Sequence, residues 1–333
     1  MLELENGLGR EVGIVVIGRN EGSRLVACLQ SLKNITLPII YVDSDSSDNS
    51  MEVAKNYGIQ SFSLPSHPFL NAARARNAGC KLLIEKYPQL QFIQFVDGDT
   101  ALEPDWLQSG FNYLHHNSDV AIVEGMLREK DKNSSIYKRF FALEWLHPKG
   151  FIAGCGGNFM IRKEALIEIH GFNEEIIGGE DSELCFRLRN QGWQIFNLGI
   201  PMGIHDSGIS SLLPLMKRMR RAGYCFQQIS CLHEDQSERL FYKENISNWI
   251  YGGLIPLLIC FLAVTKGPWS FLLLAVYPFL FLKIYLHLSK EWSFSDRVIY
   301  SVFCVLSKFP GFLGACDYLT HCAIKGPSPV PSR

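Results

Sequence analysis

Short apolar runs alternate with helical patterns along the first third of the chain. Four runs are rich in β-branched and aromatic residues, as buried strands are, and they lie at 12–17, 39–42, 59–64 and 92–96. Between them, helices are predicted at 23–32, 48–57 and 71–85. This order predicts an α/β fold with a mostly parallel sheet and helices on both faces. Ligands of such sheets bind beyond the carboxyl ends of the strands.

The pattern becomes less regular after residue 120. Residues 121–235 are richer in glycine, and helices are predicted there at 181–191 and 211–228. A polar stretch follows and predicts a linker at 236–248. We therefore expect one folded domain over 1–235 and a separate C-terminal region over 249–333.

The C-terminal region is strongly apolar. Residues 249–265 are almost wholly apolar, and residues 269–288 are nearly so, although they contain Pro278 and Lys283. A helix that crosses a membrane needs about 20 apolar residues. Two spans joined by a tight turn fit these lengths, so we expect a transmembrane helical hairpin. The alternative is a buried helical hairpin of a soluble domain.

The distribution of charge indicates how this hairpin is oriented. Lys266 lies in the turn between the two runs, and more basic residues follow the second run, namely Lys290, Arg297, Lys308, Lys325 and Arg333. This bias places both ends of the hairpin on the cytoplasmic side of a membrane, the inner or plasma membrane if the source is bacterial. Residues 298–319 are apolar but interrupted by charged residues and a proline, which predicts an interfacial or re-entrant segment.

The composition limits the class of protein. Hydrophobic residues make up 47% of the 333 residues and charged residues 20%, so the chain can bury a sizeable core. A net charge of -1 gives no overall field that would attract a nucleic acid polymer, and we expect no such partner. Ten cysteines form no CxxC pair, which favours buried thiols in a reducing compartment over a zinc site or a disulfide framework.

Acidic residues cluster where the predicted strands end. Asp97 and Asp99 stand one residue apart directly after the run at 92–96. Two such carboxylates would repel each other, and a divalent cation with a preference for oxygen ligands, Mg²⁺ or Mn²⁺, removes that repulsion. The alternative is a solvated turn, because Asp-Gly is a common turn dipeptide.

Two more polar segments follow the first two predicted strands, GRNEGS at 18–23 and VDSDSSDNS at 42–50. In a parallel sheet these segments would meet Asp97 and Asp99 at one edge. The usual phosphate-binding patterns, GxGxxG and GxxxxGK[ST], do not follow the first strand. The sequence therefore predicts one cleft with several carboxylates, and no dinucleotide or P-loop site.

The order of these motifs resembles the inverting family 2 glycosyltransferases, which have the GT-A fold. The resemblance covers roughly residues 10–230 and implies a nucleotide-binding half at 10–120 and an acceptor half at 121–235. It also implies that a set of side chains lines the nucleoside of the donor, with the first acid of VDSDSSDNS on the base. These are Arg19, Asn20, Glu21, Asp43, Arg76 and Asn77.

The same resemblance assigns the two acids of VDGDT. It implies that Asp97 reaches towards the ribose, and that Asp99 binds the Mn²⁺ or Mg²⁺ that bridges the diphosphate. A histidine in the position of His205 completes the metal shell or touches the diphosphate in several related transferases. A bound cation would offset the charge of the leaving diphosphate.

Two motifs supply the acceptor side. CGGNFMIRKEAL at 155–166 resembles the family's glycine-rich strand, and it contributes Gly156, Gly157 and Asn158. GGEDSELCFRLRNQGW at 178–193 resembles the family's ED motif, in which Asp181 beside Glu180 is the general base. A helix N-terminus favours the ionised form of such a carboxylate. The alternative is that these acids only decorate a helix N-terminus, where acids are common.

A basic cluster lies further along the chain, in MKRMRRAGY at 216–224. Arg218 and Arg221 of this cluster either contact the diphosphate or face lipid headgroups. Processive synthases of the family carry Gln-x-x-Arg-Trp at this place, and this chain has neither the glutamine nor the tryptophan. The departure indicates a non-processive enzyme.

We therefore expect metal-dependent, inverting transfer of a sugar from a nucleotide-diphosphate donor, with a UDP-sugar as the expected donor. The expected acceptor is a lipid-linked or membrane-proximal glycan, because the hairpin would hold the cleft near the bilayer. One alternative is transfer directly to polyprenyl phosphate. An alternative of another class is a membrane-anchored protein that binds nucleotide sugars or glycans without turnover.

Overall fold

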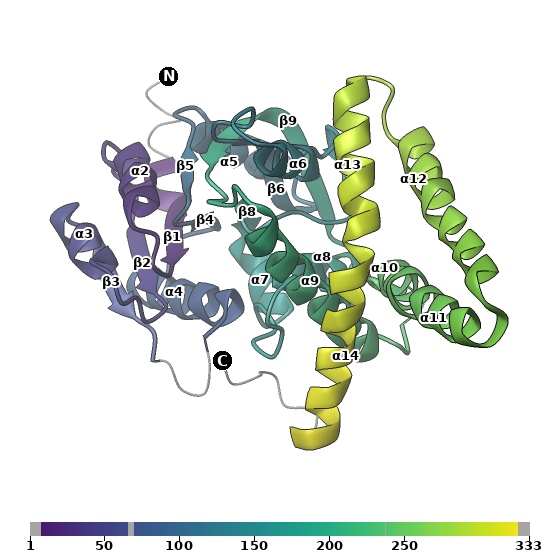
Figure 1. The fold of residues 1–333 in the computed structure, drawn as a ribbon. Coiled ribbons are helices and arrows are strands. Elements are labelled where there is room, and N and C mark those ends of the chain that lie inside the picture. The colour runs from purple at the N-terminus through teal and green to yellow at the C-terminus, as the bar shows by residue number, and fades with distance from the viewer. Residues whose placement is uncertain (1–7, 66–69, 237, 326–333) are drawn as a thin grey trace. The chain divides into compact units, whose positions relative to one another are not determined.

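The computed structural model describes residues 8–65, 70–236 and 238–325, and the chain divides into two compact units (Figure 1). The first unit comprises the described residues of Met1–Lys130 and Trp145–Ser207, and the second those of Asp131–Glu144 and Gly208–Arg333. This division differs from the expected boundary at residue 235. Where independent folding domains begin and end stays a prediction.

The first unit holds a mixed sheet and the helices that cover it. Its elements in chain order are β1 Val12–Gly18, α2 Ser23–Leu32, β2 Ile39–Asp43, α3 Ser50–Asn56, β3 Gln60–Ser63, α4 Ala72–Lys86, β4 Phe92–Asp97, β5 Thr100–Leu102, α5 Trp106–His116, β6 Val120–Glu129, β7 Gly150–Phe151, β8 Phe159–Arg162, α7 Lys163–Glu168, α8 Glu180–Asn190 and β9 Gln194–His205. The strands and helices predicted before residue 100 all begin and end within two residues of these bounds.

The strand order is β3-β2-β1-β4-β8-β6-β9-β5, with β7 added on β9. Strands β3, β2, β1 and β4 are parallel as predicted, and β6 is parallel to β9. The sheet becomes mixed beyond β4, because β8 runs antiparallel to β4 and β6, and β5 and β7 run antiparallel to β9. The register pairs Gly18 with Asp43 and Ile17 with Asp97, so the ends of β1, β2 and β4 lie at one edge.

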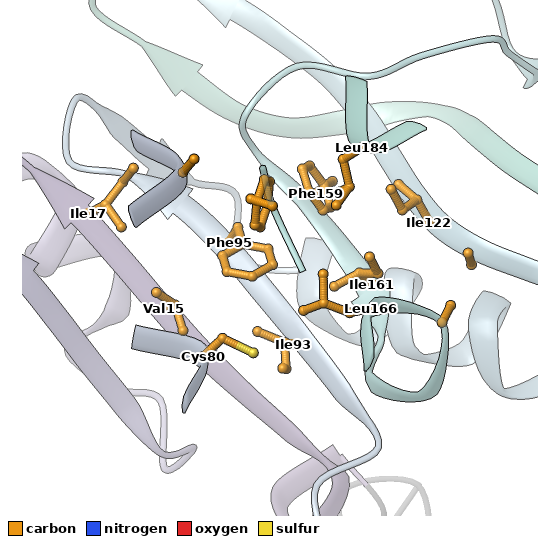
Figure 2. Packing of buried hydrophobic residues seen from close by; sticks show 14 of the residues in the cluster. Val15, Ile17, Cys80, Ile93, Phe95, Ile122, Phe159, Ile161, Leu166 and Leu184 are labelled. Carbon is orange, nitrogen blue, oxygen red and sulfur yellow. The ribbon is translucent and has the colours of Figure 1, made fainter. Parts of the chain in front are cut away.

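Buried side chains form a core on each face of the sheet. Along β1, Ile14 and Val16 belong to the cluster with α2 and α5, whereas Val15 belongs to the cluster with α4 and α8. Figure 2 shows part of the second cluster, where Phe95 and Phe159 pack edge to face with their centroids 5.4 Å apart. The alternation along the strand is what a sheet covered on both faces requires, so the predicted layering is confirmed.

The second unit is helical. Its elements are α6 Ile136–Glu144, α9 Leu212–Leu232, α10 Tyr242–Ser247, η1 Asn248–Leu254, α11 Ile255–Lys266, η2 Pro268–Ala275, α12 Val276–His287, α13 Phe294–Leu306 and α14 Lys308–Lys325. The linker expected at 236–248 is helical from Tyr242 onward, because the helix of the first apolar run begins there. Within this unit α14 packs along α9, and α12 packs against α13 (Figure 1).

Three helices of the described chain are long and apolar enough to cross a membrane, Tyr242–Lys266, Pro268–His287 and Phe294–Ile324. The first two contain the runs predicted at 249–265 and 269–288. The third contains residues 298–319, for which the sequence predicts an interfacial segment. Of the basic residues used to predict orientation, Arg333 lies outside the described residues.

The packing of α14 bears on the third helix. A Cβ on Gly314 would overlap the backbone of Arg220 on α9, and a Cβ on Gly311 would overlap the side chain of Asn248 on η1. Asp317 pairs with Arg220 of α9 through two contacts of 2.6 and 2.8 Å, and both side chains are about half exposed. A half-exposed ion pair is costly inside hydrocarbon, so this part of α14 fits an interface better than a bilayer centre.

Candidate active site

Arg76 links the two acidic motifs that the sequence predicts for one cleft. It lies on α4 and is buried, with one guanidinium nitrogen 2.7 Å from Asp97 at the end of β4 and the other 2.5 Å from Glu180 at the start of α8. Burial lowers the pKa of the guanidinium, but the neighbouring carboxylates raise it by more, so it stays charged. The DGD and ED motifs therefore meet in one site.

Glycine at 157 makes this arrangement possible. The Arg76 guanidinium also lies 3.4 Å from the Gly157 carbonyl oxygen, and a Cβ at Gly157 would collide with it and with the Asp97 carboxylate. Next to it, the buried Asn158 side chain accepts from the Asp97 backbone N–H over 2.8 Å and donates to the Asp97 carboxylate over 3.2 Å. The glycine-rich segment thus lies against the DGD motif and fixes the orientation of Asp97.

Asp99 faces His205, the last residue of β9. The Nε2 atom of His205 lies 3.4 Å from the Asp99 carboxylate, and its Nδ1 atom lies 3.0 Å from Glu129 at the end of β6. Burial lowers the pKa of His205, but Asp99 and Glu129 together raise it to about 10. The buried Glu129 orients the ring with Nε2 towards Asp99, as carboxylates behind metal-binding histidines do.

A surplus of negative charge marks the same region. Burial, and then the charge of Asp99, raise the pKa of Glu21 to about 7, although Arg24 pairs with it at 2.8 Å. Burial also raises the pKa of Asp97. Glu21 and Asp97 therefore lack enough positive charge nearby, and a divalent cation would supply it. Asp99 and His205, once Nε2 has lost its proton, would hold that cation together with donor phosphates. Among the described residues no three His, Cys, Asp or Glu side chains form a complete metal-ligand group.

The loops after β1 and β2 hold each other through polar contacts. Asp43 is buried, and its carboxylate accepts from Tyr41, from the Ser46 backbone at 2.8 Å and from the Ser46 hydroxyl at 2.6 Å. Asn20, with a φ of 56°, accepts from the Ser47 backbone over 2.7 Å. The Nε atom of Arg19 is buried without a hydrogen-bond partner in the described part of the chain. Their predicted roles at the nucleoside stay predictions.

Asp181 occupies the first turn of α8, beside Glu180 and near Arg76. Burial and the charge of Glu180 raise its pKa to about 7, while Arg76 opposes them. The sequence predicts that the helix N-terminus keeps this carboxylate ionised. The structure corrects that prediction, because loss of solvent and a neighbouring acid outweigh the helix dipole. A carboxyl with such a pKa can take up a proton near neutral pH.

Three predicted site residues have other surroundings in the structure. Asn77 accepts from the Phe172 backbone N–H and donates to the Phe172 carbonyl and to Glu174, each over 2.9 Å, so it holds the loop before α8. Arg218 and Arg221 are exposed on α9 in the second unit, where Arg218 lies over the Phe141 ring at 4.6 Å. Nucleotide contact by these three residues stays a prediction.

Residues that the sequence analysis does not single out also belong to this region. Glu129 is an acid at the end of a strand, as Asp43 and Asp97 are. A search for acids at strand ends would have found it if the sequence analysis had predicted β6. Trp145 packs against His205 with ring centroids 5.0 Å apart, and against Gly156. No spacing in the sequence connects Trp145 with either partner.

Comparison with known proteins gives two matches to family models. The model of glycosyl transferase family 2 matches residues 13–169, and the model of glycosyl transferase family group 2 matches residues 92–309. The second match covers more than half of the chain.

Relatives of similar sequence are also named as glycosyltransferases. An uncharacterized glycosyltransferase of Rickettsia prowazekii (strain Madrid E) is 28% identical over 112 residues, 33% of this chain and 35% of the relative. The chain therefore matches only about a third of that relative's length. EpsH of Bacillus subtilis (strain 168), which is named as a glycosyltransferase, is 21% identical over 259 residues, 72% of this chain and 74% of that protein.

A solved structure has a similar fold. A mannosyltransferase from Pyrobaculum calidifontis, in complex with GDP-mannose and Mn²⁺, superposes with a TM-score of 0.57 at 14% identity, over 90% of this chain and 86% of the other. At this identity the likeness concerns the fold alone.

Proposed function

Because the chain belongs to the family 2 glycosyltransferases, an enzyme family with the GT-A fold, we propose that it transfers a sugar with inversion from a nucleotide-diphosphate donor to a hydroxyl of a glycan acceptor. The transfer depends on Mn²⁺ or Mg²⁺. Membership of this family sets aside the alternative of a binding protein without turnover.

One observation carries the proposal, the double ion pair of Arg76 with Asp97 and Glu180. These two contacts connect the end of β4, expected to hold the donor, with the start of α8, expected to hold the acceptor. A buried ion pair repays the cost of desolvating its charges only where its geometry is good, as the contacts of Arg76 are. This pairing supports a site in which Asp181, the proposed base, lies close to the proposed donor site.

In this proposal, different residues of the first unit bind different parts of the donor. Asp43 and the loop after β1 would receive the nucleoside, and Asp97 would reach the ribose. Asp99 and His205 would hold the cation with the diphosphate. That cation would offset the negative charge that grows on the diphosphate as the bond to the sugar breaks.

Asp181 would act on the acceptor. It takes the proton of the acceptor hydroxyl while that oxygen attacks the anomeric carbon from the side opposite the diphosphate. The bond from the anomeric carbon to the phosphate oxygen breaks, and the nucleoside diphosphate leaves with the electron pair. The new linkage therefore has the opposite configuration to the donor.

The donor base and the place of action are finer parts of the proposal. A UDP-sugar is the proposed donor, and the complex of the Pyrobaculum mannosyltransferase with GDP-mannose makes GDP-sugars the first rival. The apolar helices at 242–266 and 268–287 support attachment to a membrane. The basic residues after the second apolar run support the proposal that the active site lies on the cytoplasmic face. A membrane-proximal or lipid-linked glycan is then the nearest acceptor. Direct transfer to polyprenyl phosphate is the second candidate.

The test is a panel of nucleotide sugars. Purified protein is incubated with UDP- and GDP-sugars in turn, with Mn²⁺ or with excess chelator, and the released nucleotide is measured. We expect slow metal-dependent release from one donor even without an acceptor, because water replaces the acceptor hydroxyl. No release from any donor, or equal release with chelator, would refute the proposed metal-dependent function.

A further inference from the structure

A second buried charge pair lies in the first unit and takes no part in the chemistry described above. His147, in the segment before β7, has its Nδ1 atom 2.6 Å from the Glu124 carboxylate on β6. Asn197 on β9 donates to the same carboxylate oxygen over 2.9 Å. Glu124 is 3% exposed, whereas the side chain of His147 is 33% exposed. The pair is therefore anchored in the core and reaches the surface at the histidine.

The charges of Glu124 and Asp181 both act on the His147 ring. The hydrogen bond to Glu124 is the main cause that raises the pKa of His147, and the charge of Asp181 raises it further. Both carboxylates also act on Cys155, whose thiol pKa is raised first by burial. Cys155 directly precedes Gly156, and its Sγ atom lies 3.4 Å from that of Cys185 on α8, the helix that begins with Glu180 and Asp181.

Trp145 holds the segment that carries His147. Its ring packs on the His205 ring at 5.0 Å, and a Cβ at Gly156 would lie only 3.2 Å from it. The segment 145–147 therefore begins against His205 and the glycine-rich segment. His147 extends from this contact, beside the segment that the sequence analysis assigns to the acceptor side.

The hydrogen bonding of His147 leaves one ring nitrogen for a ligand. A carboxylate only accepts, so Nδ1 carries a proton towards Glu124. Two nearby carboxylates favour the charged ring, in which Nε2 is also a donor. Within the described part of the chain, no other hydrogen bond engages the ring of His147.

We propose that His147 binds the acceptor. Its Nε2 atom donates a hydrogen bond to an oxygen of a neutral, hydroxyl-bearing sugar that lies beside Asp181. The inference rests on the proposed function and names its acceptor class. In this region Arg76 is paired with Asp97 and Glu180, and His147 with Glu124, so with Asp181 the carboxylates outnumber the cations. A phosphate group would meet net repulsion there, whereas sugar hydroxyls donate to carboxylates and accept from the imidazolium.

The test measures acceptor use by the full chain in a detergent that carries no sugar. The acceptors are octyl glycosides of glucose, galactose and N-acetylglucosamine, and octyl phosphate is the anionic comparison. The donor is the nucleotide sugar that releases nucleotide in the panel above, with Mn²⁺. We expect at least one octyl glycoside to raise the rate of nucleotide release, and octyl phosphate not to raise it.

Two substitutions distinguish the roles of the two ring nitrogens of His147. His147→Asn keeps an amide donor near the position of Nδ1, for Glu124, but removes the outward donor. His147→Gln places an amide donor near the position of Nε2. We expect His147→Asn to raise KM for the octyl glycoside about tenfold or more, as the loss of one charge-assisted hydrogen bond would. His147→Gln should recover part of that loss, and neither variant should change KM for the donor.

The control is His116, an exposed histidine on α5, and His116→Asn should leave both KM values unchanged. Metal-dependent nucleotide binding by each variant reports that its site is folded. An acceptor KM in His147→Asn equal to that of the wild type would overturn the proposal. So would a wild-type rate of nucleotide release that only octyl phosphate raises, or that none of the acceptors raises. Failure of the proposed function looks different, because the wild type would then release no nucleotide from any donor.

Discussion

Asp181 lies in the first turn of α8, where burial and Glu180 raise its pKa to about 7. Its substitution by asparagine keeps the shape but cannot accept a proton. General-base catalysis contributes about 10²–10⁴-fold in rate, so we expect Asp181→Asn to lower kcat by about that factor. The donor contacts proposed above come from other residues, so donor affinity should change little. Steady-state kinetics together with calorimetric titration of nucleoside diphosphate measures both quantities.

The pH profile gives a second readout of the same residue. A base works in its deprotonated form, so kcat of the wild type should fall as pH falls through about 7, and the residual rate of Asp181→Asn should lack that step. Asp119→Asn, at an exposed acid before β6, is the matched control. A loss of kcat below about tenfold would favour an acceptor that is already ionised, polyprenyl phosphate. A loss explained wholly by donor affinity would make Asp181 structural.

Where a motif coincides with a strand or helix end, the sequence can predict which side chains lie in one region. Asp97 and Glu180 are far apart in the chain, and the structure places both on Arg76. Partners chosen by long-range packing are not predictable in this way. Nothing in the spacing of Glu124 and His147 indicates that they form a pair, and the motif that contains Asn77 gives no sign that it holds the Phe172 backbone.

Helices α11, η2 and α12 expose large apolar side chains, among them Val264 at 89% and Trp269 at 77%. Burial of such surface in lipid is strongly favourable, and the continuous helices Tyr242–Lys266 and Pro268–His287, to which these elements belong, are long enough to cross a bilayer. We expect the protein to stay with the membrane pellet after a wash with alkaline carbonate. A wash with concentrated salt is the control for attachment through the basic residues of α9 alone. Complete release by carbonate would show that the helices do not insert.

Periodicity predicts elements most reliably where it is long. The strands β1 to β4 and the helices between them have clear patterns, and the sequence finds them all. In the C-terminal region, Pro310 suggests an interruption of the apolar segment, yet it lies in the first turn of α14. A proline is tolerated there because that backbone position needs no helical hydrogen bond. The interruption therefore separates α13 from α14 without ending the helical region.

At the scale of the whole molecule, the chain leaves its first unit and returns to it. Residues 131–144 belong to the second unit, where α6 packs against α13 and Arg139 lies 2.6 Å from Asp296. The sequence analysis does not predict this excursion, because it joins segments more than 150 residues apart through contacts that no local pattern records. A single boundary near residue 235 is the simplest division that composition alone offers.

The central claim is that the acids at the strand ends bind a nucleotide-diphosphate donor through a divalent cation. Asp99 faces His205, whereas Asp97 is held by Arg76 and Asn158. Removal of the charge of Asp99 should therefore abolish the metal-dependent part of binding, and Asp97→Asn should weaken binding less.

Calorimetric titration of the full chain with UDP and with GDP, with Mn²⁺ and with chelator, measures this directly. We predict that one nucleotide binds to the wild type only when Mn²⁺ is present, that Asp97→Asn keeps part of that dependence, and that Asp99→Asn has none. Equal Mn²⁺-dependent affinity in the wild type and Asp99→Asn would contradict the claim.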